Sequence, residues 1–232
     1  MSLRVVVTAA GQGRRMGGGN KMLVPLGGEP ILVRTLRVFQ DHPRVAEVAV
    51  SAPAGQEEDY RSLFRRHGLD RVRRVVTGGA ERQDSIFQAL QALDLKDGDR
   101  VAVHDGARPL VSAELLDRLC EALEGWDGVV PGVPVKDTIK QVDEHGRVLK
   151  TLVRSELMAV QTPQVFRAEV LLEAYRQALS QGHVGTDDAS LVEWFQGRVR
   201  VIPGDYRNLK ITTAEDLALA ESLLEEGAVA AP

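Results

Sequence analysis

The sequence predicts an α/β fold, a doubly wound and mostly parallel sheet with a protruding β-hairpin arm. Short β-branched apolar runs alternate with segments of helical periodicity along most of the chain. Parallel strands need long crossover connections, which helices usually supply. One polar stretch breaks the alternation, and 232 residues suffice for one substantial core. We therefore predict a single domain, residues 1–232, with the arm at about 134–160.

Five apolar runs have the length and composition of buried strands. They are Leu3 to Ala9, Val45 to Val50, Val72 to Thr77, Val101 to His104 and Val129 to Val133. The segments between them repeat apolar side chains at helical spacing, and Thr212 and Thr213 are placed to cap a final helix. Ligands of such sheets bind beyond the carboxyl ends of the strands, so the loops there are the candidate sites.

The stretch that breaks the alternation predicts the arm. Two β-rich pieces, Ile139 to Val142 and Val148 to Val153, flank the turn Glu144-His145-Gly146-Arg147. A hairpin with so few apolar residues is not stable alone and must pack on something. A second subunit and an ordinary edge position on the same sheet both satisfy this need.

The composition excludes several classes of function. A net charge of −4 gives no broad electrostatic reason to bind nucleic acid or an anionic membrane. No apolar run reaches the roughly 18 to 20 residues that span a bilayer, and no export pattern is present, so we expect a cytoplasmic protein. The lone Cys120 lies in an apolar helical pattern and is expected in the core.

Residues 9–21 form a glycine-rich loop after the first predicted strand, with five glycines and the three cations Arg14, Arg15 and Lys21. Glycines let backbone N–H groups approach an anion, and the cations neutralise phosphate charge, which favours a triphosphate site. The loop matches neither the P-loop nor the dinucleotide fingerprint. On glycine content alone it would be a flexible turn, and the cations change that interpretation.

Two further loops follow predicted strands. Asp105, Gly106 and Arg108 follow the fourth, where Asp105 would hold a metal-bound nucleotide or, alternatively, close a turn with Arg108. We assign no chemistry to His104. The loop of residues 78–85 would form a base pocket or a simple capped turn, with Asp84 or Ser85 beginning the helix. The polar residues Lys136, Asp137, Thr138, Arg154, Thr162 and Lys210 receive no role from periodicity.

Six segments, in order along nearly the whole chain, carry a resemblance to a known family. They are Ala9-Ala10-Gly11-x-Gly13-x-Arg15-Met16 with Lys21, His104-Asp105-x-Ala107-Arg108-Pro109, Val135-Lys136-Asp137-Thr138, Thr162-Pro163-Gln164, Thr186-Asp187-Asp188-Ala189-Ser190, and Asn208-Leu209-Lys210-Ile211-Thr212 before Glu215-Asp216-Leu217. Together they closely resemble the 2-C-methyl-D-erythritol 4-phosphate cytidylyltransferases, which have a Rossmann-like nucleotidyltransferase fold.

The resemblance implies a reaction in which methylerythritol phosphate attacks the α-phosphorus of CTP and pyrophosphate leaves, in non-mevalonate isoprenoid synthesis. It implies a divalent ion, usually Mg²⁺, whose protein ligands stay unassigned. Arg15 and Lys21 would stabilise the transition state, while Arg154 and Lys210 would position the acceptor phosphate. Because the nucleophile is already anionic, no general base is needed, and catalysis comes from positioning and charge neutralisation.

The resemblance also assigns the remaining site residues. Asp137, Thr138 and Arg108 would help to position the substrate. In the family, Thr138 and Arg154 belong to a hairpin arm that reaches the partner's active site, which implies a homodimer. The nucleotide-binding set would be Ala9, Ala10, Gly11, Gly13, Gly79, Ser85, Asp105, Gly106 and Thr162.

Two departures from the family pattern stand out. Asn20 precedes Lys21 where the family often has proline, and we expect it to loosen the loop. Arg207 replaces a common Asp near Lys210, a role that Asp205 would have to fill. The alternatives are a ribitol 5-phosphate cytidylyltransferase and a non-catalytic nucleotide-binding regulator. Such a regulator would have no need of Arg154 and Lys210.

Overall fold

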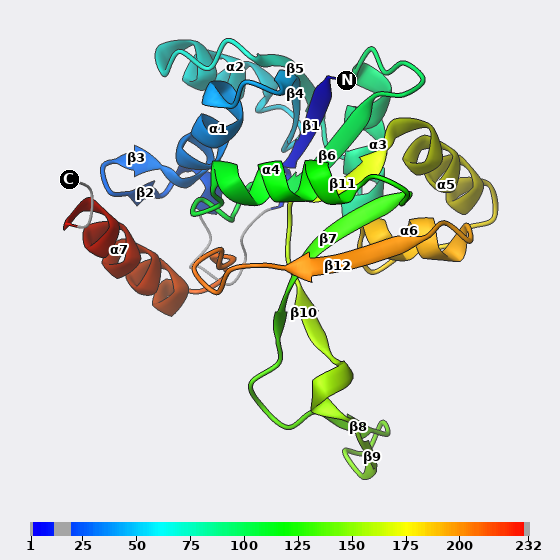
Figure 1. Ribbon diagram of the computed structural model, residues 1–232. Helices are drawn as coiled ribbons and strands as arrows, with labels where there is room; N and C mark the ends of the chain where they lie inside the picture. Colours follow the sequence, from blue (N-terminus) through cyan, green and yellow to red (C-terminus); the bar gives the residue numbers. More distant parts are fainter. Residues whose placement is uncertain (1, 12–19, 230–232) are drawn as a thin grey trace.

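The computed structural model describes residues 2–11 and 20–229. Its centre is an eight-stranded sheet with the order β10-β7-β11-β6-β1-β4-β5, in which β12 also pairs with β7 (Figure 1). The strands are β1 Leu3–Thr8, β4 Val45–Ala52, β5 Val72–Thr77, β6 Arg100–Asp105, β7 Gly128–Pro134, β10 Met158–Val160, β11 Gln164–Arg167 and β12 Val199–Pro203.

The strand pairing is mostly parallel, as the sequence predicts. β1 pairs in parallel with β4 and β6, β4 with β5, and β7 with β12. The exceptions are β10 and β11, which run antiparallel to their neighbours. All five predicted strands are present, whereas β10, β11 and β12 were not predicted because they are short or lack a continuous apolar run.

Helices cover both faces of the sheet, which confirms the doubly wound prediction (Figure 1). Successive residues of β1 alternate between the faces: Val5 and Val7 pack in the core under α1, α2 and α4, while Val6 packs under α3, α5 and α6. Cys120 of α4 is buried in the first core, as predicted. The helices are α1 Ile31–Asp41, α2 Glu57–Arg66, α3 Arg82–Ala92, α4 Ala113–Ala122, α5 Ala168–Ser180, α6 Asp188–Trp194 and α7 Ala214–Val229.

The final helix, α7, begins where the sequence predicts. The Asp216 carboxylate accepts from the backbone N–H of Thr212 and Thr213, and the Thr213 hydroxyl accepts from Asp216 N. α7 lies against the small hairpin of β2 Pro25–Leu26 and β3 Glu29–Pro30. A separate apolar cluster joins them, with Leu26, Ile211 and Ala220 fully buried.

The predicted arm leaves the sheet after β7 and projects away from the body (Figure 1). Its tip is the antiparallel pair β8 Lys140–Val142 and β9 Val148–Thr151, followed by the short 3-10 helix η3 Arg154–Glu156. Every residue of both tip strands is exposed. The root is anchored to the body, because the Tyr206 hydroxyl donates to Pro134 O at 2.6 Å and Lys136 lies 4.0 Å from the centre of the Tyr206 ring.

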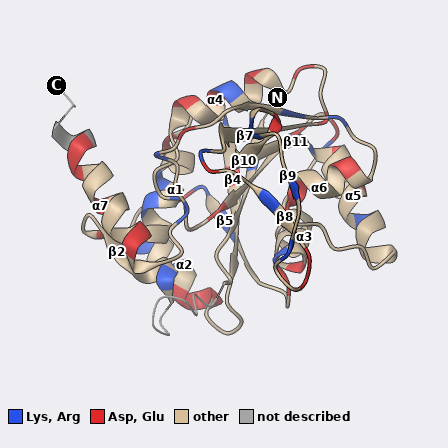
Figure 2. Ribbon diagram, turned by 90° about the horizontal axis from the view of Figure 1, so that it is seen from below, with Lys and Arg blue, Asp and Glu red and all other residues tan. Residues whose placement is uncertain are grey.

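Charge is spread over the surface rather than gathered by sign. Figure 2 shows basic and acidic residues interspersed on the helices, and α2 carries Glu57, Glu58 and Asp59 in its first turn and two arginines in its last. None of the helices in the described part of the chain is long and apolar enough to cross a membrane.

Candidate functional site

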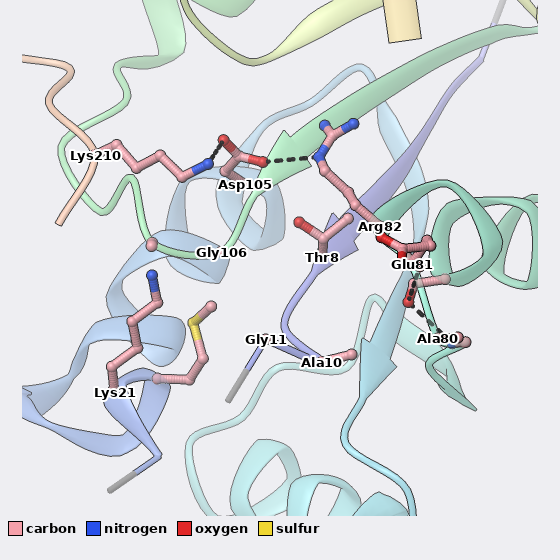
Figure 3. A pocket seen from close by; sticks show the side chains of 14 residues that line it. Thr8, Ala10, Gly11, Lys21, Ala80, Glu81, Arg82, Asp105, Gly106 and Lys210 are labelled. Atoms are coloured by element: carbon pink, nitrogen blue, oxygen red, sulfur yellow. Dashed lines mark hydrogen bonds and ion pairs between the residues drawn. The ribbon is translucent and has the colours of Figure 1, made fainter. Parts of the chain in front are cut away.

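A cavity of about 230 Å³ opens beyond the carboxyl ends of β1 and β6, beside the beginning of α3 (Figure 3). This is the place where doubly wound sheets bind their ligands. Lys210, Asp105 and Arg82 lie in a row, and the Lys21 side chain points toward them from the opposite side (Figure 3). The lining residues are Thr8, Ala10, Gly11, Lys21, Met22, Gly79, Ala80, Glu81, Arg82, Ser85, Asp105, Gly106, Ala107 and Lys210.

Asp105 is the electrostatic centre of the cavity, and only 9% of its side chain is exposed. Lys210 Nζ lies 2.8 Å from its Oδ2, Arg108 Nε 3.7 Å from the same oxygen, and Arg82 Nε 3.5 Å from Oδ1. Burial would raise the pKa of Asp105, but Arg82, Lys210 and Arg108 together hold that pKa well below its usual value. The carboxylate is therefore ionised, and its pairing with Arg108 is one part of a larger cluster.

His104 has a structural role, consistent with the absence of predicted chemistry. It is fully buried, and burial lowers its pKa to about 4, so the ring is neutral. Its Nε2 lies 3.1 Å from Arg108 O and must carry the proton, because a carbonyl can only accept. Nδ1 therefore accepts from the Thr162 hydroxyl at 3.1 Å, and that oxygen accepts from Asp105 N at 3.0 Å. This chain of hydrogen bonds fixes the backbone on both sides of Gly106.

Asn20 fixes the position of Lys21. The expectation that it loosens the glycine-rich loop stays a prediction, because residues 12–19 lie outside the described residues. The side-chain oxygen of Asn20 accepts from Met22 N and caps the 3-10 helix η2 Lys21–Leu23, while its amide donates to Gln56 and to the Tyr60 hydroxyl. Lys21 Nζ donates to Ile211 O at 3.2 Å, next to Lys210 in sequence. The two lysines thus approach the cavity from positions 189 residues apart in the sequence.

The loop before α3 forms a tight wall of the cavity. The Ser85 hydroxyl accepts from Gly79 N at 3.0 Å and donates to Glu81 O at 3.1 Å. A Cβ on Gly79 would lie 2.2 Å from Asp84 Cβ, so only glycine fits there. The helix begins earlier than predicted, because Glu81 is the N-cap and forms a capping box with Asp84. Asp84 and Ser85 thus lie within the first turn of α3.

The cavity brings together many, but not all, of the predicted site residues. Ala9, Arg108 and Thr162 support it without lining it, and Gly13 and Arg15 lie outside the described residues. Asp137, Thr138 and Arg154 are exposed on the arm, where Arg154 donates to Lys136 O. The predicted residues that line the cavity are Ala10, Gly11, Lys21, Gly79, Ser85, Asp105, Gly106 and Lys210.

Asp205 and Arg207 are engaged by local backbone groups. Asp205 Oδ1 accepts from Arg207 N, and the Arg207 guanidinium donates to Leu223 O. Neither is among the described residues that line the cavity. Sequence reasoning also gave no role to Arg82, which lines the cavity and pairs with Asp105. The sequence feature that could have indicated this role is the position of Arg82 beside the paired glycines, at the start of a helix.

A divalent ion fits this cavity only in cooperation with a substrate. Among the described residues, no group of three or more His, Cys, Asp or Glu side chains is placed to hold a metal. Mg²⁺ at nucleotide sites is commonly held by one or two carboxylates together with phosphate oxygens and water. The ionised Asp105 at the cavity wall meets that requirement.

Comparisons with known proteins identify the family. The sequence profile of the family described as 2-C-methyl-D-erythritol 4-phosphate cytidylyltransferase matches residues 3–226 of this chain. The enzyme of that name from Symbiobacterium thermophilum is 52% identical over 97% of this chain and 93% of its own length. The one from Geobacillus thermodenitrificans is 45% identical over 97% of both chains.

Comparison with solved structures identifies the same family. A 4-diphosphocytidyl-2C-methyl-D-erythritol synthase from Anaerococcus prevotii superposes with a TM-score of 0.84 at 31% identity, covering 97% of this chain and 96% of the other. The 2-C-methyl-D-erythritol 4-phosphate cytidylyltransferase from Francisella tularensis gives 0.82 at 33% identity, covering 96% and 99%. The chain therefore belongs to the 2-C-methyl-D-erythritol 4-phosphate cytidylyltransferase family.

Proposed function

We propose that this chain transfers CMP from CTP to 2-C-methyl-D-erythritol 4-phosphate and releases pyrophosphate, as a step of non-mevalonate isoprenoid synthesis. The observation that carries the proposal is the convergence of Lys21 and Lys210 on one cavity around the ionised Asp105. Two anionic substrates repel each other, and fixed cations between them offset that repulsion. The identity of the two substrates is inferred from the family to which the chain belongs.

The reaction needs positioning more than proton transfer. A phosphate oxygen of the acceptor forms a bond to the α-phosphorus of CTP while the bond from that phosphorus to the pyrophosphate oxygen breaks. Lys21 and Arg15 stabilise the charge on the transferring group, and Lys210 draws the acceptor phosphate into line. Asp105 is the residue that would hold a divalent ion, and that ion would neutralise part of the triphosphate charge.

The nucleotide is held by the glycine-rich walls. Ala10, Gly11 and Gly79 leave room for the nucleoside, and Ser85 fixes the Gly79 backbone. Backbone groups that pair with the exocyclic amine of cytosine would face an unpaired oxygen in uracil. We therefore expect CTP to be preferred to UTP.

The arm completes the site from a second subunit. Val142, Val148, Leu149 and Val153 on the arm are each 50–54% exposed, an apolar set that a second copy of the chain would cover. Thr138 and Arg154 would then reach the partner's cavity and contact the acceptor phosphate. The proposal also includes that the protein is cytoplasmic and that the reaction depends on Mg²⁺.

Pyrophosphate release measured with CTP and each acceptor tests this function. We expect release with 2-C-methyl-D-erythritol 4-phosphate, dependence on added Mg²⁺, and a product of the mass of 4-diphosphocytidyl-2-C-methyl-D-erythritol. Preference for ribitol 5-phosphate would overturn the choice of substrate. Binding of CTP without turnover of any acceptor would favour a regulator.

A further inference from the structure

Arg82, the first residue of α3, bridges two carboxylates at the wall of the cavity. Its Nη2 lies 2.8 Å from Asp188 Oδ2, and its Nε lies 3.5 Å from Asp105 Oδ1. A planar guanidinium carries N–H groups on separate edges and can hold two carboxylates at fixed positions, a geometry that the flexible ammonium of lysine does not fix. Arg82 thus joins the carboxylate of the site to a carboxylate behind it.

Asp188 is the fixed end of this bridge. Its side chain is completely buried, and its Oδ1 accepts from the Tyr175 hydroxyl at 2.5 Å. Burial and the neighbouring Asp188 raise the pKa of Tyr175 well above its usual value, so the hydroxyl remains a donor. Asp187 provides the cap of α6, so the Asp188 carboxylate is not needed for that purpose. Asp188 of α6 is therefore held by Tyr175 of α5 and pairs with Arg82 of α3.

The charges on both sides keep Arg82 in place. Burial alone would lower its pKa, but Asp188 and Asp105 together raise the pKa of Arg82 above its ordinary value. Asp188 is fully buried, and a buried charge that loses its partner is costly, which restricts the geometry of the pair. The guanidinium is therefore a permanent cation with two fixed neighbours.

The two oxygens of Asp105 have different partners. Oδ2 faces Lys210 and Arg108, whereas Oδ1 faces Arg82. Without Arg82, Oδ1 would lose the guanidinium that faces it. The carboxylate could then rotate while it stayed attached to Lys210.

We propose that Arg82 is a positioning residue for nucleotide binding, which acts through Asp188 to fix the orientation of Asp105. The proposal rests on the function proposed above, because it takes CTP with its divalent ion as the ligand that Asp105 meets. Asp188 and Tyr175 then belong to the same positioning network as Arg82, although neither lines the cavity.

Calorimetric titration of CTP with Mg²⁺, in the absence of acceptor, tests the proposal with wild type, Arg82→Gln and Arg82→Lys. We expect Arg82→Gln to weaken CTP binding at least about tenfold, since a hydrogen bond to a charged group is lost. Arg82→Lys should recover only part of this loss. The KM for the acceptor phosphate should stay within about twofold of wild type, because Lys210 is retained.

Arg100→Gln is the matched control. Arg100 stands at the opposite end of β6 and donates to Cys120 O at 2.8 Å, so it is also a partly buried arginine on the strand of Asp105. This variant should lower the melting temperature and leave CTP affinity unchanged. A second probe, Asp188→Asn, removes the anchoring charge with little change in volume and should weaken CTP binding by a smaller factor.

Unchanged or tighter CTP binding by folded Arg82→Gln would overturn the proposal. So would an equal loss of affinity for the acceptor, which would indicate general collapse of the site. If Arg82→Gln does not fold, unchanged CTP binding by Asp188→Asn would overturn it instead. Wild-type protein that binds CTP without releasing pyrophosphate would contradict the proposed function while leaving the Arg82 result interpretable.

Discussion

Removing Lys210 should abolish most turnover while barely affecting stability. Its Nζ lies 2.8 Å from Asp105 Oδ2, but 42% of the lysine side chain is exposed. Water screens such a pair, which contributes about 1 kcal/mol or less to folding. Asp105 also keeps Arg82 and Arg108 as partners. In a chain of this length that loss lowers the melting temperature by roughly 2–4 °C.

The expected effect of Lys210→Ala on catalysis is much larger. Loss of one fixed donor to a developing anion typically costs about a hundredfold or more in turnover. Pyrophosphate release under saturating CTP measures this loss, and calorimetric melting measures stability in parallel. Lys210→Arg retains the charge and should recover part of the rate. Turnover within about threefold of wild type in Lys210→Ala would refute the assigned role, as would a rate loss explained by unfolding.

Three further predictions follow from the same site. Arg15→Ala and Lys21→Ala should each lower turnover by about a hundredfold or more with the fold intact, and near-normal pyrophosphate release by either would contradict its role. Mixing inactive Arg15→Ala and Arg154→Ala subunits should restore some activity, because one site of a hybrid dimer would be intact. Heterodimers that are shown to form but have no activity would exclude a site shared through the arm. The neutral, buried His104 has a pKa of about 4, below that of the unfolded chain, so its contribution to stability is complete above about pH 6.5 and falls as the pH drops toward 4. Urea unfolding gives the difference in unfolding free energy between wild type and His104→Asn at each pH. This difference should be about 2 kcal/mol smaller at pH 4.5 than at pH 7, and a constant difference would mean that the ring is not held neutral.

The sequence predicted the parts of the fold that depend on local pattern. The β-branched runs predicted β1 and β4 because parallel strands buried on both faces are continuously apolar. The arm was predicted from the opposite pattern, two polar β-rich pieces around Gly146, whose φ is 79°. β11 was missed because its pairing with β6 and β7 depends on long-range contacts rather than on its own composition.

The site was predicted as far as residue type and position at strand ends allow. Asp105 and Lys210 were placed in the loops, and the structure brings them into contact across 105 positions of sequence. The Arg82–Asp188 pair was not predicted, because its partners come from different helices and neither position is unusual by itself. Likewise, the hydrogen bonds from Asn20 to distant Gln56 and Tyr60 were not predicted, since such contacts leave no trace in local sequence.

A crystal structure with CTP, Mg²⁺ and 2-C-methyl-D-erythritol 4-phosphate bound tests the central claim most directly. If fixed cations hold the two anions in line, Lys21 Nζ and Lys210 Nζ will each lie within about 3 Å of a phosphate oxygen. The acceptor oxygen, the α-phosphorus and the pyrophosphate oxygen will then lie nearly on one line. Lysine side chains that face away from both substrates would contradict the account.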